Sequence, residues 1–180
     1  MSVKDVGVRV PSSAHMKYSI WIIPPEPIFG QIKKVIDELS KKYEGPLFEP
    51  HMTLLGGIDN DISEIERNIK LLPSNGEKLE LTLGPVSFST TYFQSVLVRV
   101  NSTAKLMKLN MDTKEILGLE NNVFMPHISL LYGNHDMSIR EEIASKIHFP
   151  KISFAVNEFI ITPSTDNPSE WAHSAVIPFE

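Results

Sequence analysis

The 180-residue sequence contains no cysteine, no long apolar run and no basic cluster. The absence of cysteine excludes disulfides, thiol catalysis and cysteine-ligated zinc together. It also fits a reducing interior, so we expect a cytoplasmic protein. The longest apolar run is Ile20–Ile23, which ends at Pro24-Pro25. A membrane-spanning helix needs about 20 apolar residues, so we expect no membrane partner.

Positive charge is also sparse along the chain. There are 17 Lys and Arg residues against 22 Asp and Glu residues, which gives a formal net charge of −5 at pH 7. The basic residues gather only as the pairs Lys33-Lys34 and Lys41-Lys42, too few to bind duplex DNA or RNA electrostatically. We therefore expect no long nucleic acid as a partner, whereas a small anionic ligand remains compatible with this balance.

Length and composition indicate one folded unit. At roughly 150 residues per domain the chain makes about one domain, and a chain of this size can build a core without covalent cross-links. Residues 1–15 are polar and aperiodic, and we expect a disordered leader or a cloning remnant there. Residues 16–180 are expected to form a single domain.

Short strand-like runs alternate with amphipathic helices after residue 16. Strands are predicted at 18–23, 51–55, 79–83 with 86–89 as an extension, 92–100, 127–132, 154–162 and 175–179. Helices are predicted at 32–43, 62–72, 102–117 and from 138 onward, where Ser138 and Glu141 have the spacing of a capping box. The mixture, with no glycine-rich phosphate loop after a strand, favours an α+β fold with antiparallel sheets.

One internal repeat stands out. Residues 50–57 read Pro-His-Met-Thr-Leu-Leu-Gly-Gly, and residues 126–133 read Pro-His-Ile-Ser-Leu-Leu-Tyr-Gly. Residues i and i+2 of a strand point to the same face, so His51 should lie beside Thr53, and His127 beside Ser129. A duplication without a site would explain the shared leucines and glycine. It would not explain why a histidine and a hydroxyl recur together on one face.

Two imidazoles and two hydroxyls that converge in one cleft suit cleavage of a phosphodiester without a metal. One neutral imidazole removes a proton from water, one imidazolium protonates the departing oxygen, and the hydroxyls bind the non-bridging oxygens. We expect His127 to be the base and His51 the acid, although the near symmetry of the two copies makes this assignment reversible. A two-histidine metal site is less suitable, because such sites usually add carboxylates or cysteines. We expect no metal.

These motifs resemble those of the 2H phosphoesterase superfamily, which is marked by two His-x-Thr/Ser motifs. Phe48–Thr53 and Pro126–Tyr132 are most similar to the cyclic phosphodiesterases of plants and yeast. That family acts on 2′,3′-cyclic nucleotides and ADP-ribose 1″,2″-cyclic phosphate. Tyr18–Trp21, Phe93-Gln94 and Trp171 also have counterparts, so the resemblance covers residues 17–180. It implies a bilobal, pseudo-twofold catalytic domain in which two antiparallel sheets line a central cleft and helices lie outside.

The resemblance also implies the roles of single residues. His51 and His127 would be the catalytic pair, and Thr53 and Ser129 would hold the phosphate. The family needs neither a metal nor an organic cofactor, so we expect none.

Two aromatic residues are carried over in the same way. Tyr132 resembles the family's active-site tyrosine, and Phe93 resembles a residue that stacks on a nucleobase. Strand alternation alone places Tyr132 on the face opposite His127, unless a twist or bulge at the strand end redirects it. Phe93 and Trp21 are equally compatible with the cleft wall and with the core.

The expected function is metal-independent hydrolysis of nucleotide cyclic phosphates to phosphomonoesters by a monomer, with a 2′-phosphate product implied by the resemblance. One alternative is an enzyme of the same superfamily that processes RNA ends or 2′,5′-phosphodiesters. Another is a non-catalytic module that binds cyclic phosphates, although a pure binder would not need both histidines. The remaining candidates, His135, His148 and His173, lack a hydroxyl partner in a strand, and we expect them at the surface.

Overall fold

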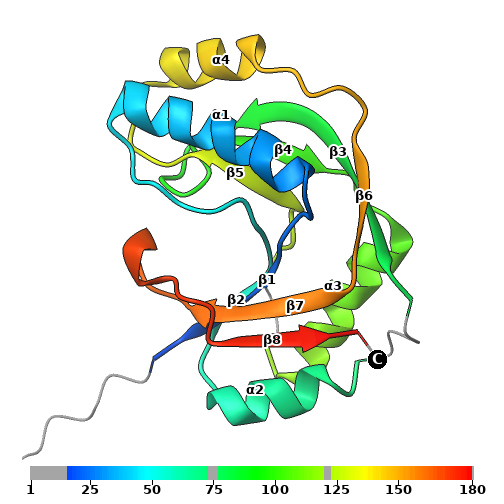
Figure 1. The fold of residues 1–180 in the computed structure, drawn as a ribbon. Helices are drawn as coiled ribbons and strands as arrows, with labels where there is room; N and C mark the ends of the chain where they lie inside the picture. Colours follow the sequence, from blue (N-terminus) through cyan, green and yellow to red (C-terminus); the bar gives the residue numbers. More distant parts are fainter. Residues whose placement is uncertain (1–15, 73–76, 120–122, 180) are drawn as a thin grey trace, which may run out of the picture.

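The computed structural model describes residues 16–72, 77–119 and 123–179, so the expected leader at 1–15 lies outside the described residues. Two four-stranded antiparallel sheets form the centre of the fold (Figure 1). The first sheet has the order β2 (Met52–Ile58), β1 (Tyr18–Ile22), β7 (Glu158–Pro163), β8 (Ala175–Pro178). The second has the order β5 (His127–Leu131), β4 (Val96–Val100), β3 (Leu79–Phe88), β6 (Ser153–Val156). The predicted α+β class with antiparallel sheets is confirmed.

The strands that carry the repeat, β2 and β5, occupy equivalent places in the two sheets. Each lies at one edge of its sheet, and the two edges contact each other. The two copies of the motif are therefore brought together by the packing of one sheet against the other.

Four α-helices cover the outer faces of the sheets, together with a short 3₁₀ helix at Pro168–Glu170. Helices α1 (Ile28–Tyr43) and α4 (Met137–Lys146) pack on the second sheet, and α2 (Ile62–Ile69) and α3 (Ala104–Ile116) pack on the first (Figure 1). Helix α1 follows β1 in sequence but packs against β5, and α3 follows β4 but packs against β2. Each sheet is thus covered partly by a helix from the other half of the chain. No helix in the described part of the chain is long and apolar enough to span a membrane.

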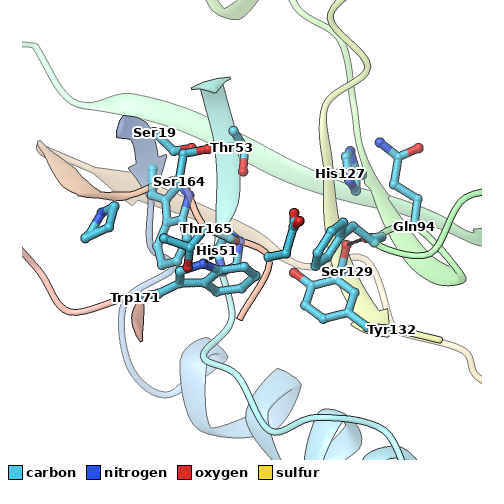
Figure 2. Close-up of a pocket in the computed structure, with 14 residues that line it drawn as sticks. Ser19, His51, Thr53, Gln94, His127, Ser129, Tyr132, Ser164, Thr165 and Trp171 are labelled. Carbon is cyan, nitrogen blue, oxygen red and sulfur yellow. Dashed lines mark hydrogen bonds between the residues drawn. The ribbon is translucent and has the colours of Figure 1, made fainter. Parts of the chain in front are cut away.

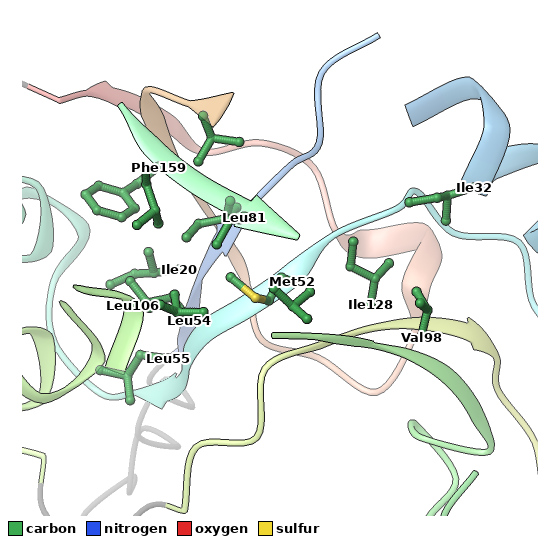
Figure 3. Close-up of a cluster of buried hydrophobic side chains, with 14 of the residues drawn as sticks. Ile20, Ile32, Met52, Leu54, Leu55, Leu81, Val98, Leu106, Ile128 and Phe159 are labelled. Atoms are coloured by element: carbon green, nitrogen blue, oxygen red, sulfur yellow. The ribbon is translucent and has the colours of Figure 1, made fainter. Parts of the chain in front are cut away.

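The core is one continuous cluster that runs between the sheets and under the helices (Figure 3). Met52 and Leu54 of β2 are each 1% exposed, and Ile128 and Leu130 of β5 are 1% and 0% exposed. These residues lie on the face opposite the repeated histidines and hydroxyls, as the alternation predicts. Burial of each such side chain stabilises the fold by about 1.5–3 kcal/mol.

Both motif strands contain a β-bulge at the same place in the repeat. The residues paired across the bulge are Ile20 with Leu55 and Trp21 with Thr53 in the first sheet, and Val96 with Leu131 and Leu97 with Ser129 in the second. The extra residues, Leu54 and Leu130, reverse the alternation, so both leucines of each copy are buried. The repeated glycines, Gly57 and Gly133, then adopt φ angles of 73° and 143°. The bulges explain the Leu-Leu pair of the repeat, and the positive φ angles explain its glycine.

Three predicted strands differ from the structure. The segment 154–162 is not one strand: it breaks at Asn157, so that β6 joins the second sheet and β7 the first. The segment 92–95 forms a turn, and β4 begins only at Val96. Strand β2 also runs through Gly56-Gly57 to Ile58, whereas we expected it to end at the glycines.

The predicted capping box at Ser138 and Glu141 does not form. The carbonyl of Asp136 already accepts hydrogen bonds from the N–H groups of Ile139 and Arg140. Helix α4 therefore begins at Met137, and Ser138 lies within its first turn.

Candidate active site

All six residues predicted to form the site line one cavity of about 360 Å³ between the two sheets (Figure 2). These residues are His51, Thr53, Phe93, His127, Ser129 and Tyr132. The cavity is also lined by Ser19, Trp21, Gln94, Pro163, Ser164, Thr165, Asp166 and Trp171. The two copies of the repeat therefore face a shared space, as the pleat and the pseudo-twofold arrangement require.

The two histidine rings are held by equivalent hydrogen bonds. Nδ1 of His51 lies 2.8 Å from the carbonyl oxygen of Glu49, and Nδ1 of His127 lies 2.7 Å from that of Met125. A carbonyl oxygen only accepts, so each Nδ1 carries the hydrogen and donates it. In a neutral ring Nε2 then has a free lone pair. Each copy of the motif thus supplies an imidazole nitrogen that can accept a proton.

His51 lies in a largely aromatic environment. Its ring stacks on Trp21 with 3.6 Å between centroids and 9° between planes, and Trp171 meets it edge-on at 5.7 Å. Burial lowers the pKa of His51 from 6.5 to about 4. The hydrogen bond to the Glu49 carbonyl opposes this shift, and the nearby charges of His127 and His173 add to it. His51 is therefore neutral at pH 7.

His127 has a related but less apolar environment. Burial lowers its pKa below 6.5, and the hydrogen bond to the Met125 carbonyl works in the opposite direction. Arg99 is its direct partner on β4, and the guanidinium charge lowers the pKa of His127 further. The two imidazoles are thus alike in geometry but differ in their surroundings.

The two hydroxyls differ in their hydrogen bonds. Ser129 Oγ donates to the carbonyl oxygen of Phe93 at 2.8 Å. In the described part of the chain, the Thr53 hydroxyl has no protein hydrogen-bond partner, and Thr53 lines the same cavity as the two histidines (Figure 2). Thr53 can therefore bind a ligand oxygen directly, whereas Ser129 must first release its present acceptor.

Tyr132 lies on the cavity side, as the resemblance implied and simple alternation did not. The bulge at Leu130 shifts the alternation by one residue and returns Tyr132 to the face of His127. Its ring stacks on Phe48 with 3.9 Å between centroids. Burial raises the pKa of Tyr132 well above 10, and a hydrogen bond with Ser129 offsets only part of this rise. The phenol therefore remains protonated and can donate a hydrogen bond.

The structure places both ambiguous aromatic residues at the cavity. Phe93 is half-buried on the turn before β4 and meets Tyr132 edge-on at 5.2 Å. Trp21 is 3% exposed and forms a wall of the cavity behind His51. Both are thus wall residues that also contact other buried rings.

The segment 163–166 belongs to the cavity wall, which the sequence did not predict. The segment lies in the connection that follows the predicted strand 154–162 and carries no predicted site residue. The N–H of Ser164 donates to the carbonyl of Lys17 at 2.7 Å, and Trp171 Nε1 donates to the carbonyl of Thr165 at 2.8 Å. These contacts fold the segment over the first sheet. No local pattern in a polar loop signals such a fold.

The three other candidate histidines do not all lie where we expected them. His148 and His173 are exposed, and Nε2 of His173 lies 2.5 Å from Oε1 of Glu49, just outside the cavity. His135 is half-buried, with its Nε2 buried and its ring against Tyr43, so only part of its side chain lies at the surface. Within the described residues, no group of three or more His, Asp or Glu side chains is arranged to hold a metal ion.

Comparisons with known proteins agree with these observations. A family model described as cyclic phosphodiesterase-like protein matches residues 16–149. A cyclic phosphodiesterase of Arabidopsis thaliana is 28% identical over 116 residues, which cover 64% of this chain and 64% of that protein. The chain thus spans just under two thirds of the length of this curated relative.

Two solved structures share the architecture. Escherichia coli LigT in complex with NADP⁺ has a TM-score of 0.56 and 18% identity, and the match covers 93% of this chain and 99% of LigT. The protein TT0787 of Thermus thermophilus has a TM-score of 0.63 and 13% identity, with 91% and 98% covered. At these identities the likeness establishes the fold, and the expected bilobal arrangement of two sheets with outer helices is confirmed.

Proposed function

The chain belongs to the cyclic phosphodiesterase-like protein family, and from this premise we propose that it hydrolyses nucleotide cyclic phosphates by acid/base catalysis between His51 and His127. One observation carries the proposal: both imidazoles line the same cavity with Nδ1 anchored on a backbone carbonyl. Each therefore has Nε2 available for proton transfer. A cavity built only for binding would need hydrogen-bond donors but not two such rings.

The reaction needs two proton transfers. A water molecule attacks phosphorus, and the neutral imidazole takes its proton as the new P–O bond forms. The bond from phosphorus to one ribose oxygen then breaks, and the second histidine, as imidazolium, protonates that oxygen. The product is a phosphomonoester, a 2′-phosphate if the 3′ oxygen departs. Thr53 and Ser129 bind the non-bridging oxygens, whose charge must be stabilised throughout.

The surroundings of the rings favour a particular assignment of base and acid. Burial in the aromatic environment keeps His51 neutral down to about pH 4. A histidine that remains neutral suits the base, and the less apolar surroundings of His127 suit the acid. This is the reverse of the assignment that we expected from the sequence.

The assignment can be tested with a substrate whose leaving group needs no protonation. A 4-nitrophenyl phosphodiester of a nucleoside has such a leaving group, so loss of the acid should matter little. We expect His127→Ala to retain far more of the wild-type rate on this substrate than on a 2′,3′-cyclic nucleotide, and His51→Ala to be impaired on both. The opposite pattern would restore His127 as the base.

The walls of the cavity support a nucleotide as the substrate. Phe93, Trp171 and Tyr132 contact one another and line the same cavity as the histidines. A nucleobase stacks favourably on such rings, at about 1–3 kcal/mol per base. The structural relative LigT was solved in complex with NADP⁺, a dinucleotide, which agrees with this choice of substrate.

The decisive experiment is product analysis. Purified protein is incubated with 2′,3′-cyclic AMP in excess EDTA, and the products are separated by chromatography. We expect one nucleoside monophosphate. His51→Ala and His127→Ala should each lower the rate by about 10²–10⁴-fold, while His148→Ala, which removes an exposed imidazole, should not.

The other outcomes identify the alternatives. Cleavage of oligonucleotides but not of mononucleotides would indicate an enzyme for RNA ends or 2′,5′-linkages. Binding of cyclic nucleotides without any turnover would indicate a binding module. Either result would overturn the proposed reaction.

A further inference from the structure

Arg140 is a buried cation behind the cavity wall. Its side chain comes from α4, is 2% exposed, and has no carboxylate partner within the described residues. It donates to four backbone carbonyls: Nε to His135 at 2.8 Å, Nη1 to Ser89 at 2.7 Å and Thr91 at 3.0 Å, and Nη2 to Gly133 at 3.2 Å. Burial of a charge is costly unless it is fully hydrogen-bonded, and the planar guanidinium meets this need with several donors at fixed angles.

The carbonyls that Arg140 binds belong to the two chain segments next to the cavity. Ser89 and Thr91 lie in the connection between β3 and β4, which also carries the cavity residues Phe93 and Gln94. Gly133 directly follows Tyr132, and its N–H donates to the carbonyl of Tyr92 at 3.1 Å. Arg140 therefore ties the aromatic wall of the cavity to helix α4 without touching the cavity itself.

Ser129 provides a second attachment for the same wall, but one that a substrate would remove. Its hydroxyl has one hydrogen, which it donates to the carbonyl of Phe93. A phosphate oxygen bound by Ser129 would need that same hydrogen. The bond from Ser89 Oγ to the carbonyl of Gln94 lies within the segment and does not attach it to the rest of the protein. Without the Ser129 bond, the side chain of Arg140 and the backbone bond from Gly133 N–H to the Tyr92 carbonyl hold the segment.

We propose that Arg140 is a positioning residue that keeps Phe93 in place for the nucleobase when Ser129 transfers its hydrogen bond to the phosphate. This inference rests on the proposed function, because it assigns the phosphate to Ser129 and the base to Phe93. It predicts that Arg140 matters for the nucleoside part of a ligand and not for its phosphate.

The test compares two ligands and two substrates. In Arg140→Lys the charge remains but the fork of donors is lost. We expect KM for 2′,3′-cyclic AMP to rise by about tenfold, since stacking on one ring is worth about 1–3 kcal/mol, with little change in kcat. For ethylene glycol cyclic phosphate, which has no nucleoside, kcat/KM should stay at the wild-type value. Lys146→Ala removes an exposed cation from the same helix and should match the wild type on both substrates.

Calorimetry of ligand binding separates this inference from the proposed reaction. Arg140→Lys should weaken binding of adenosine 2′-monophosphate by about tenfold and leave binding of inorganic phosphate unchanged, whether or not the protein turns over cyclic phosphates. If neither substrate is turned over but this selective loss is seen, the proposed reaction fails and the positioning role holds. Equal losses for both ligands, or none for the nucleotide, would overturn the positioning role.

A second variant keeps the test valid if Arg140→Lys does not fold. A Cβ at Gly133 would overlap with Nε2 of His135, so Gly133→Ala must displace one of these two residues. The carbonyls of both residues bind Arg140, whose side chain is left intact. We expect the same selective loss for the nucleotide, and an unselective loss would again show a purely structural role.

Discussion

Replacing His51 by asparagine should make the stability of the fold less sensitive to acid. The folded protein holds His51 with a pKa of about 4, whereas the unfolded chain has the ordinary value of 6.5. Between these values the unfolded state binds more protons. The free energy of unfolding must therefore fall as pH decreases from 6.5 towards 4, and this contribution is fully present above pH 6.5.

The size of the effect follows from the shift. One pKa unit corresponds to about 1.4 kcal/mol, so the wild-type protein should lose about 3 kcal/mol between pH 7 and pH 4 through His51 alone. No large correction for solvent screening applies, because the side chain is 7% exposed. Asparagine does not titrate in this range, and its side-chain amide can donate to the Glu49 carbonyl as Nδ1 does. The variant should thus lack this component of the acid sensitivity.

The assay is urea unfolding followed by circular dichroism at pH 7 and pH 4, at one ionic strength. We expect the loss of unfolding free energy on acidification to be about 3 kcal/mol smaller in His51→Asn than in the wild type. His148→Asn, at an exposed position, controls for the removal of one imidazole. An equal loss in His51→Asn and the wild type would refute the argument that burial depresses the pKa of His51.

Three further predictions concern the cavity, the core and a glycine with a positive φ angle. Thr53→Val and Ser129→Ala should each lower kcat/KM for 2′,3′-cyclic AMP by about tenfold or more, since a hydrogen bond to a charged group is worth about 1.5–3 kcal/mol. Steady-state rates that stay at the wild-type value would exclude phosphate binding by these hydroxyls. Leu54→Ala should lower the free energy of unfolding by about 2–5 kcal/mol in urea titrations, and Leu47→Ala, at a position that is 64% exposed, should have little effect. Gly57→Ala should lower the free energy of unfolding by about 1–2 kcal/mol through the φ angle of 73° alone, because no other atom lies within 4 Å of the added Cβ. A variant that unfolds at the same temperature as the wild type would contradict this.

The local pattern of the sequence was sufficient to identify both motif strands and the face of each residue near the histidines. Period-two alternation placed Thr53 with His51 and Met52 in the core, and both placements are confirmed. The alternation could not locate Tyr132, because a bulge is set by pairing with the neighbouring strand. Only the register of β4 against β5 shows that Leu130 is the extra residue.

Long-range contacts decided the features that the sequence did not predict. Residues 154–162 contain no glycine or proline, so nothing local indicates that the chain changes sheets at Asn157. The stacking of Trp21 on His51 depends on the pairing of β1 with β2. The hydrogen bonds of Arg140 also depend on long-range contacts, because its acceptors lie up to 51 residues away in the chain. No spacing rule links Arg140 to the two motifs.

Trp21 and Trp171 are the two tryptophans of the chain, and both line the cavity. The intrinsic fluorescence of the whole protein therefore originates at the place where a ligand would enter. A compound that occupies this space should change the emission without any attached dye, whereas one that settles elsewhere on the surface should leave the signal unaltered. The molecule thus contains its own optical reporter for screening candidate ligands.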